Sequence, residues 1–185
     1  MRIETASVDD APGIAAVHLS SLRASHEPLL PDRAAHLVVD AADVEGRARS
    51  WRSWIERSRV STFVARVDGE VQGFSTLHPM PGEPSQRSTA ELSALFVAES
   101  HWRHGLGRRL CERTLTEARE RGFSEVVLWV LEVNDRARRF YELMGFRPDG
   151  ETRVFLEVAS GPLLELRYRR STTRRSESTA SKAIG

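Results

Sequence analysis

Apolar residues follow two different periods along the chain, and each change of period marks the boundary of a predicted element. Short stretches rich in Val, Leu, Phe and Thr predict strands, and longer stretches with an apolar residue every three or four positions predict helices. We predict strands at 2–6, 61–67, 70–77, 89–97 and 124–131, and helices after Asp9-Asp10, at 44–57, at 105–121 and from Asn134 to Gly145. The remainder predicts a strand from Phe146 with a break near 148–150, then a hairpin of 153–158 and 163–168.

The order of these elements is β-α-α-β-β-β-α-β-α-β-β, which predicts a mixed α/β sheet with helices on both faces. Asp9 or Asp10 is expected to cap the first helix, and Asn134 is expected to cap the last one. Gly122 and Gly145 stand where glycine commonly closes a helix. The local signals therefore agree with the periodicity on where the helices begin and end.

The stretch 90–110 combines a predicted strand, a glycine turn and the start of a helix. Its strand half, 92–97, contains no charged residue, as expected for a strand that is covered on both faces. Gly105 and Gly107 then bracket Leu106 before the helical period begins. Such a turn leaves backbone N–H groups unpaired at a helix N-terminus, and the helix dipole makes them an anion site suited to phosphate.

Spacing separates three kinds of phosphate-binding loop. A Walker loop requires Gly-Lys followed by Ser or Thr, whereas an arginine follows Gly107 in this chain. A dinucleotide-binding fingerprint requires a third glycine or alanine three residues after the second glycine, and that position is Leu110. The third pattern is Gln/Arg-x-x-Gly-x-Gly/Ala after an apolar strand, and residues 102–107 match it except at Trp102.

A second motif follows further along the chain, where residues 134–146 read N-D-R-A-R-R-F-Y-E-L-M-G-F. The two motifs together resemble the signatures of the GCN5-related N-acetyltransferase (GNAT) family, the second of which is N-x-x-A-x-x-F-Y-x-x-x-G-F. The resemblance covers roughly residues 1–170, and its specific part is 90–146. It implies a mostly antiparallel central sheet with splayed middle strands, helices on both faces and acetyl-CoA as co-substrate.

The resemblance also implies which residues contact acetyl-CoA. Backbone N–H groups of the turn would hold the pyrophosphate, and they belong to Arg103, His104, Gly105, Leu106, Gly107 and Arg108. The pantetheine arm would lie between the strands at 89–97 and 124–131 and pair with the backbone of Leu95, Phe96 and Val97. Asn134 would contact the same arm. Trp102 departs from the Gln or Arg of the family, at a position that contributes mainly its backbone.

Three residues are implied to carry the chemistry. The Leu95 N–H would stabilise the oxyanion that forms when an amine attacks the thioester. Glu91 lies fourteen residues before Gly105, which is the offset of the base in the histone-acetyltransferase branch; a water relay or Glu132 is the alternative base. Tyr141 would protonate the leaving thiolate, and the alternative is a tyrosine that only packs in the core.

Composition narrows the class of protein. The 185 residues carry a net charge of +1, which does not indicate a nucleic-acid binder, and no apolar run is long enough to predict a membrane partner. The single cysteine, Cys111, excludes an intrachain disulfide and favours a cytoplasmic location. The six histidines lack metal-binding spacing, so we predict no metal.

We expect one domain over 1–170 and a disordered tail over 171–185, which has no apolar period.

The sequence therefore predicts an acetyl-CoA-dependent N-acetyltransferase that acetylates a primary amine of a small molecule or peptide by direct attack in a ternary complex. A non-catalytic acyl-CoA-binding regulatory module of the same fold is the alternative. The acceptor stays open among antibiotics, polyamines, amino acids and protein N-termini, because the segments expected to bind it contain no motif. Trp51 and Trp54 are expected in the core, on a helix that flanks the acceptor cleft. A homodimer through the C-terminal strands is expected by analogy alone.

Overall fold

The computed structural model describes residues 1–26, 29–30, 44–80, 88–158 and 161–173. Within these ranges a seven-stranded sheet has the strand order β1-β2-β3-β4-β5-β7-β6. The strands are β1 (Arg2–Thr5), β2 (Ser61–Val67), β3 (Glu70–Pro79), β4 (Thr89–Val97), β5 (Glu125–Leu131), β6 (Arg147–Val158) and β7 (Gly161–Ser171). Neighbouring strands are antiparallel except β4 and β5, which are parallel. The predicted mixed sheet is confirmed.

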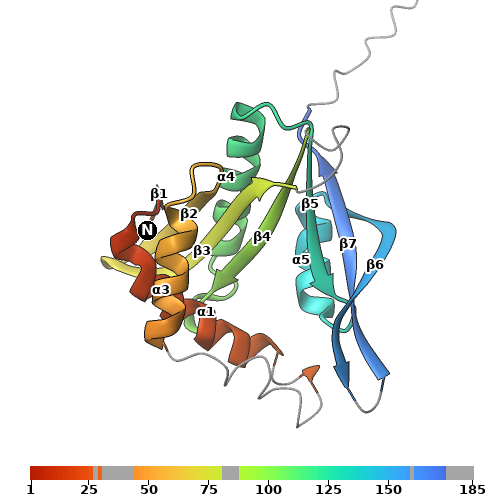
Figure 1. Ribbon diagram of the computed structural model, residues 1–185, viewed down its shortest axis with the longest axis horizontal. Coiled ribbons are helices and arrows are strands. Elements are labelled where there is room, and N and C mark those ends of the chain that lie inside the picture. Colours follow the sequence, from red (N-terminus) through yellow and green to blue (C-terminus); the bar gives the residue numbers. More distant parts are fainter. Residues whose placement is uncertain (27–28, 31–43, 81–87, 159–160, 174–185) are drawn as a thin grey trace, which may run out of the picture.

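Helices cover both faces of this sheet, as predicted (Figure 1). They are α1 (Ala11–His26), α3 (Val44–Ile55), α4 (Leu106–Glu120) and α5 (Asp135–Leu143), with short 3-10 turns η1 (Val8–Asp10) and η4 (Glu99–His101). On one face, Ile14 and Trp51 from α1 and α3 pack on Phe74 of β3. On the other, Leu115 of α4 and Phe140 of α5 belong to one apolar cluster with strand residues. The predicted order of elements is confirmed.

The start of α1 differs from the prediction that Asp9 or Asp10 caps it. Ser7 is the N-cap of η1, which leads directly into α1. The Ser7 amide donates to Asp10 Oδ2 (2.8 Å), and Asp10 also forms an ion pair with Arg66 of β2. The prediction was wrong because a 3-10 turn precedes α1. Ser7 therefore takes the N-cap position of a capping box, and Asp10 takes its N3 position.

The ends of the two helices near the site follow the sequence closely. The Asn134 side chain accepts a hydrogen bond from the Ala137 amide (3.0 Å), which confirms it as the cap of α5. Gly122 and Gly145 follow α4 and α5 with φ angles of +78° and +83°, a conformation that glycine adopts without strain. These residues fix where α4 and α5 end and the next strands begin.

The C-terminal strands form a longer hairpin than predicted. The predicted break near 148–150 is an irregularity in the pairing of β6 with β7, between Pro148 and Thr152, within one continuous strand. Residues 171–173, assigned to the tail by sequence, still belong to the sheet region, because the Thr172 amide donates to Ser124 O (2.9 Å). The rest of the predicted tail lies outside the described residues.

The two middle strands separate along their length. Among the described residues, β4 pairs with β5 at three positions, Thr89 to Glu91 with Glu125 to Val127. Beyond this point β4 pairs with β3 and β5 pairs with β7. The pairing register of β4 with β3 shifts so that Leu92 and Ala94 oppose adjacent residues of β3, which places a bulge at Ser93. The predicted splayed strands are confirmed, and Figure 1 shows β4 and β5 diverging.

Candidate active site

A cavity of about 1180 Å³ occupies the space between the diverging strands. It is lined by α1, α3, β4, the glycine turn, β5, α5 and the β6–β7 hairpin. The predicted site residues that line it are Leu95, Phe96, Val97, Arg103, Gly105, Gly107, Arg108, Asn134 and Tyr141. Of the other predicted residues, Leu106 is buried in the core, His104 is exposed, and Glu91 lies one residue before the lining begins on β4. The tertiary structure thus brings both sequence motifs to one cavity.

The glycine turn presents free backbone donors at the start of α4. Gly105 has a φ of +82° and is the N-cap, and Arg103 also has a positive φ of +64°. Within α4 the Arg109 amide donates to Gly105 O (3.1 Å). The three preceding amides, of Leu106, Gly107 and Arg108, therefore have no partner within the helix. They form an anion-binding site in which the helix dipole adds to the attraction.

Three arginines place positive charge beside this turn, and one of them was missed in the sequence. Arg103 and Arg108 come from the turn itself, whereas Arg136 comes from the first turn of α5 and also lines the cavity. Burial lowers the pKa of the Arg136 guanidinium, with smaller effects from Glu99, which raises it, and Arg103, which lowers it. Arg136 occupies one of the undefined positions of the second motif, so the motif gave no signal for it.

Trp102 contributes a side chain to the cavity, whereas this position was expected to contribute mainly its backbone. Its indole Nε1–H donates to the carbonyl oxygen of Val97 (2.7 Å), and the Ser21 hydroxyl donates to the same oxygen (3.0 Å). The Arg136 guanidinium lies 3.5 Å from the centre of the Trp102 ring, a cation–π contact. The indole thus links the end of β4 to the start of α5 across the mouth of the gap.

The backbone of β4 alternates between its two edges. The Ala98 amide, just after the strand, donates to Gln72 O near the start of β3 (2.9 Å). Because amide directions alternate along a strand, the backbone groups of Leu95 and Val97 point to the opposite edge, where the cavity lies. The backbone of Phe96 points to β3 for the same reason, and its ring packs against His18 at 4.7 Å between centroids. Of the three β4 residues predicted to pair with the pantetheine arm, Leu95 and Val97 therefore direct their backbone groups to the cavity, and Phe96 does not.

Tyr141 lines the cavity from α5. Its ring packs edge-on against Phe140 (5.2 Å) and Phe146 (5.9 Å), which fixes its orientation. Burial raises the pKa of the Tyr141 phenol well above its ordinary value, and the nearby Cys111 adds to this rise. The hydroxyl is therefore protonated at every pH at which the protein would be assayed, so it is available as a donor.

The two predicted base candidates lie at the margin of the cavity. Glu91 is half-buried on β4, opposite His78 of β3 in the pairing register. Glu132 is exposed after β5, and its carbonyl accepts a hydrogen bond from Arg138 (3.0 Å). Among the described residues that line the cavity, the single carboxylate belongs to Glu165, which sequence reasoning did not single out. Neither candidate base is thus among the described residues that line the cavity.

The remaining lining comes from helix α3 and the C-terminal strands. Both Trp51 and Trp54 line the cavity, although they were expected mainly in the core. The Trp51 indole N–H donates to His18 Nδ1 (3.3 Å), so this nitrogen carries no proton. Arg153 of β6 pairs with Glu165 of β7 (2.6 Å) and lies over the Trp129 ring at 4.4 Å. This part of the cavity is therefore lined by aromatic rings and by the ion pair of Arg153 with Glu165.

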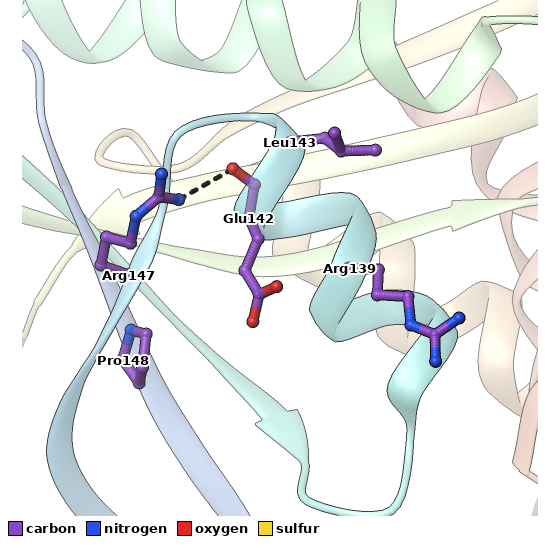
Figure 2. A pocket seen from close by; sticks show the side chains of 5 residues that line it. All are labelled: Arg139, Glu142, Leu143, Arg147 and Pro148. Carbon is purple, nitrogen blue, oxygen red and sulfur yellow. Dashed lines mark hydrogen bonds between the residues drawn. The ribbon is translucent and has the colours of Figure 1, made fainter.

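A second, smaller cavity of about 440 Å³ lies at the outer side of α5. Figure 2 shows the residues that line it, which are Arg139, Glu142, Leu143, Arg147 and Pro148. Arg147 donates to the backbone oxygen of Glu142 (2.9 Å), and the Glu142 carboxylate accepts from the Tyr168 hydroxyl (3.0 Å). Since none of the lining residues belongs to the predicted site, we assign the chemistry to the larger cavity.

Cys111 is buried on α4 and packs in the core, as expected. Burial raises the pKa of its thiol to about 12, so it carries no thiolate at neutral pH. Over the described part of the chain, no group of three or more His, Cys, Asp or Glu side chains is arranged to hold a metal ion. Over the same part, no helix is long and apolar enough to cross a membrane.

Known proteins that are similar to this chain are acetyltransferases. The acetyltransferase (GNAT) family model matches residues 27–146. A protein of Mycobacterium tuberculosis named a probable N-acetyltransferase is 29% identical over 174 residues, which cover 91% of this chain and 92% of that protein. A Staphylococcus aureus N-acetyltransferase structure has a TM-score of 0.75 at 19% identity, with coverages of 93% and 98%.

A further structure, from Salmonella typhimurium, was determined with its cofactor acetyl-CoA. It has a TM-score of 0.72 at 21% identity and covers 97% of this chain and 98% of its own. At such identities the structures show a shared fold, and the family model, which matches more than half of the chain, shows the family. The chain therefore belongs to the GNAT family of acetyltransferases and is an acetyl-CoA-dependent N-acetyltransferase.

Proposed function

We propose that this enzyme transfers the acetyl group of acetyl-CoA to a primary amine that is bound beside it in the same cavity. The observation that carries the proposal is the separation of β4 from β5 beyond Glu91, which joins the anion site of the glycine turn to Leu95 and Tyr141 in one space. A continuous cavity lets both substrates bind together, so the amine reaches the thioester without a covalent enzyme intermediate.

The residues present fit acetyl-CoA. The free amides at the start of α4 and the guanidinium groups of Arg103, Arg108 and Arg136 suit its phosphates. The Val97 carbonyl already accepts from Trp102 and Ser21, so the pantetheine arm would pair with the Leu95 backbone and the Val97 amide. The acetyl-CoA bound to the structural relative from Salmonella typhimurium supports the same ligand here.

The chemistry then follows from the groups in the cavity. The amine nitrogen forms a bond to the acetyl carbon, and the Leu95 N–H stabilises the resulting oxyanion, worth about 3 kcal/mol for one such donor. The carbon–sulfur bond breaks, and Tyr141 gives its proton to the departing thiolate. The proton lost by the amine passes through water, with Glu91 as the proposed final acceptor because it lies next to the lining. Burial raises the pKa of Tyr141, which disfavours loss of its proton. The same burial disfavours a charged thiolate, which favours transfer of that proton to the sulfur.

A thermal-shift titration tests the cofactor part of this proposal. CoA and acetyl-CoA should raise the Tm of the wild-type protein by mass action, because they bind the folded state. Gly107→Asp places a negative charge at the anion site, and a Cβ at this position meets ordinary contacts at 3.6 Å from Phe140, so the variant should fold. It should lose the shift. A wild-type protein without any shift would overturn the proposed function.

A shift without acetyl transfer to any amine would instead favour the alternative, a non-catalytic acyl-CoA-binding module.

A cytoplasmic location belongs to the same proposal, supported by the single cysteine in the chain. The single domain over 1–170, the absence of nucleic acid and membrane partners, and a homodimer through the C-terminal strands stay predictions.

A further inference from the structure

One face of α3 presents three large side chains to the cavity. Arg47, Trp51 and Trp54 are spaced at i, i+4 and i+7 and therefore lie along the same side of the helix. The rings of Trp129 and Phe155 line the same cavity. This surface lies beside the thioester site and outside the glycine turn, so it belongs to the part of the cavity that the amine would occupy.

Arg47 carries an unpaired polar group on this face. Its Nε is buried from solvent and has no hydrogen-bond partner among the described residues. No ion pair joins Arg47 to a carboxylate within the described ranges. In contrast, Arg153, which lines the cavity from β6, forms an ion pair with Glu165 at 2.6 Å. An unpaired guanidinium that is partly removed from water is costly, and an anionic group of a ligand would relieve that cost.

Trp54 supplies a second unpaired donor two turns further along. Its Nε1–H is buried and has no partner among the described residues, although its ring packs against His78 (5.5 Å). The indole of Trp51, between the two, already donates to His18. The face thus offers two unused donors, one of them cationic, on either side of an apolar aromatic surface.

The charge of the cavity points in the same direction. Three of the five lining arginines are assigned to the phosphates of acetyl-CoA and Arg153 pairs with Glu165, so among the described residues Arg47 supplies the uncompensated charge of the acceptor part. A polyamine or another polycation would meet repulsion from this lining. A ligand with a carboxylate would gain a charge-assisted hydrogen bond from Arg47, and an apolar body would cover the indole of Trp51.

We propose that the acceptor is an amine that also carries a carboxylate and an apolar side chain, such as a free hydrophobic amino acid, with its carboxylate on Arg47. The indole N–H of Trp54 donates to an oxygen of the same molecule. This assignment rests on the proposed acetyl transfer and selects among the acceptors that the sequence leaves open. It excludes polyamines and cationic antibiotics as the preferred substrates.

Matched pairs of amines test the carboxylate. The panel compares L-phenylalanine with phenethylamine, L-leucine with isoamylamine, and both with spermidine, and it measures kcat/KM by release of the CoA thiol. The carboxylated member of each pair should react with a kcat/KM about tenfold or more higher, the worth of one charge-assisted hydrogen bond. Arg47→Gln should remove this preference, chiefly by raising the KM for the carboxylated member of each pair.

Arg49→Gln is the matched control, because Arg49 lies two residues further along, on the exposed side of α3, and pairs with Glu45 (3.3 Å). It should leave the preference intact. Equal rates within each pair, preference for spermidine, or a preference that survives Arg47→Gln would overturn the inference, while acetyl transfer itself would stand.

Calorimetric binding of the same amines to the CoA-bound protein separates the two proposals. If no amine is acetylated, the proposed function fails, yet tighter binding of the carboxylated members that is lost in Arg47→Gln would still support the acceptor class. If none of the carboxylated members binds, the inference is overturned.

Discussion

The indole of Trp102 and the carbonyl of Val97 share a 2.7 Å hydrogen bond that closes the open edge of β4 where the strand ends. Ser21 of α1 donates to the same oxygen, so one carbonyl holds together the strand, the first helix and the loop before the glycine turn. Because Arg136 of α5 lies over the same indole, Trp102 connects both halves of the splayed sheet at the cofactor end of the cavity.

Trp102→Phe should therefore lower the stability of the protein. The phenyl ring keeps the contact with Arg136 but cannot donate to Val97, and the loss of one buried hydrogen bond costs about 1 kcal/mol. Urea denaturation measures the change in the free energy of unfolding. The double variant with Ser21→Ala should lose more than the sum of the two single variants, because the carbonyl is then left without a donor. Strict additivity would contradict a shared role at this oxygen.

Arg136→Gln should raise the KM for acetyl-CoA about fivefold and leave kcat nearly unchanged, because it removes a charge that we propose binds a phosphate and that touches no reacting atom. Steady-state kinetics at low and high salt measure this, and the difference from wild type should shrink as salt rises. Arg139→Gln is the control on the same helix, since Arg139 faces the small outer cavity shown in Figure 2. An equal effect of both substitutions would indicate a general loss of charge rather than a phosphate contact.

Tyr141→Phe should lower kcat by about a hundredfold and change the KM for acetyl-CoA much less, because only the proton donor is lost. In the wild-type enzyme, the raised pKa of Tyr141 predicts that kcat does not fall with rising pH until well above 10, its ordinary value. The other tyrosine, Tyr168, is the control: its hydroxyl bonds Glu142 and Arg138 outside the cavity, so Tyr168→Phe should reduce stability and spare kcat. An unchanged kcat in Tyr141→Phe would leave this residue a packing role alone.

The two glycines of the turn should respond to alanine in opposite ways. Gly105 has a φ of +82°, so Gly105→Ala should cost about 1 kcal/mol or more of stability through backbone strain. Gly107 has helical backbone, and an added Cβ meets Phe140 at 3.6 Å, an ordinary contact. Gly107→Ala should then gain about 0.5 kcal/mol, because alanine favours the helix. Thermal unfolding of the two variants without CoA decides this, and loss of stability in both would refute the distinction.

Asp149 should make the stability of the C-terminal hairpin depend on acid pH. Burial alone would raise the pKa of its carboxyl, but hydrogen bonds from the Glu151 amide, Arg167 (2.7 Å) and Arg169 (2.9 Å) outweigh burial and lower it. A carboxyl with a lowered folded-state pKa stabilises the protein above its unfolded pKa of about 3.9, and this contribution is lost as pH falls below that value.

Asp149→Asn should therefore reduce the free energy of unfolding by about 1–3 kcal/mol at neutral pH and by less as pH falls below about 4. Urea denaturation across this range measures the difference. A difference between the two proteins that stays constant with pH would show that charge at Asp149 is not responsible.

The sequence by itself determined the local features of this protein. Periodicity placed the strands and helices, and single residues with strong backbone preferences, such as Asn134, Gly122 and Gly145, marked their ends. The two GNAT motifs predicted the glycine turn and Tyr141, which the structure brings to one cavity. These features depend on neighbours within a few residues in the chain, so the order of residues is enough to predict them.

The tertiary structure alone decided which side chains complete the site. Trp102 and Arg136 meet because the loop before α4 and the start of α5 flank the same gap, and Arg47 of α3 and Trp129 of β5 line the same cavity. No local pattern predicts which of these side chains come together, because each of them is compatible with its own helix or loop in many tertiary arrangements. Only the parting of β4 from β5 beyond Glu91 creates the space that these residues line, and that parting depends on pairing between strands distant in the chain.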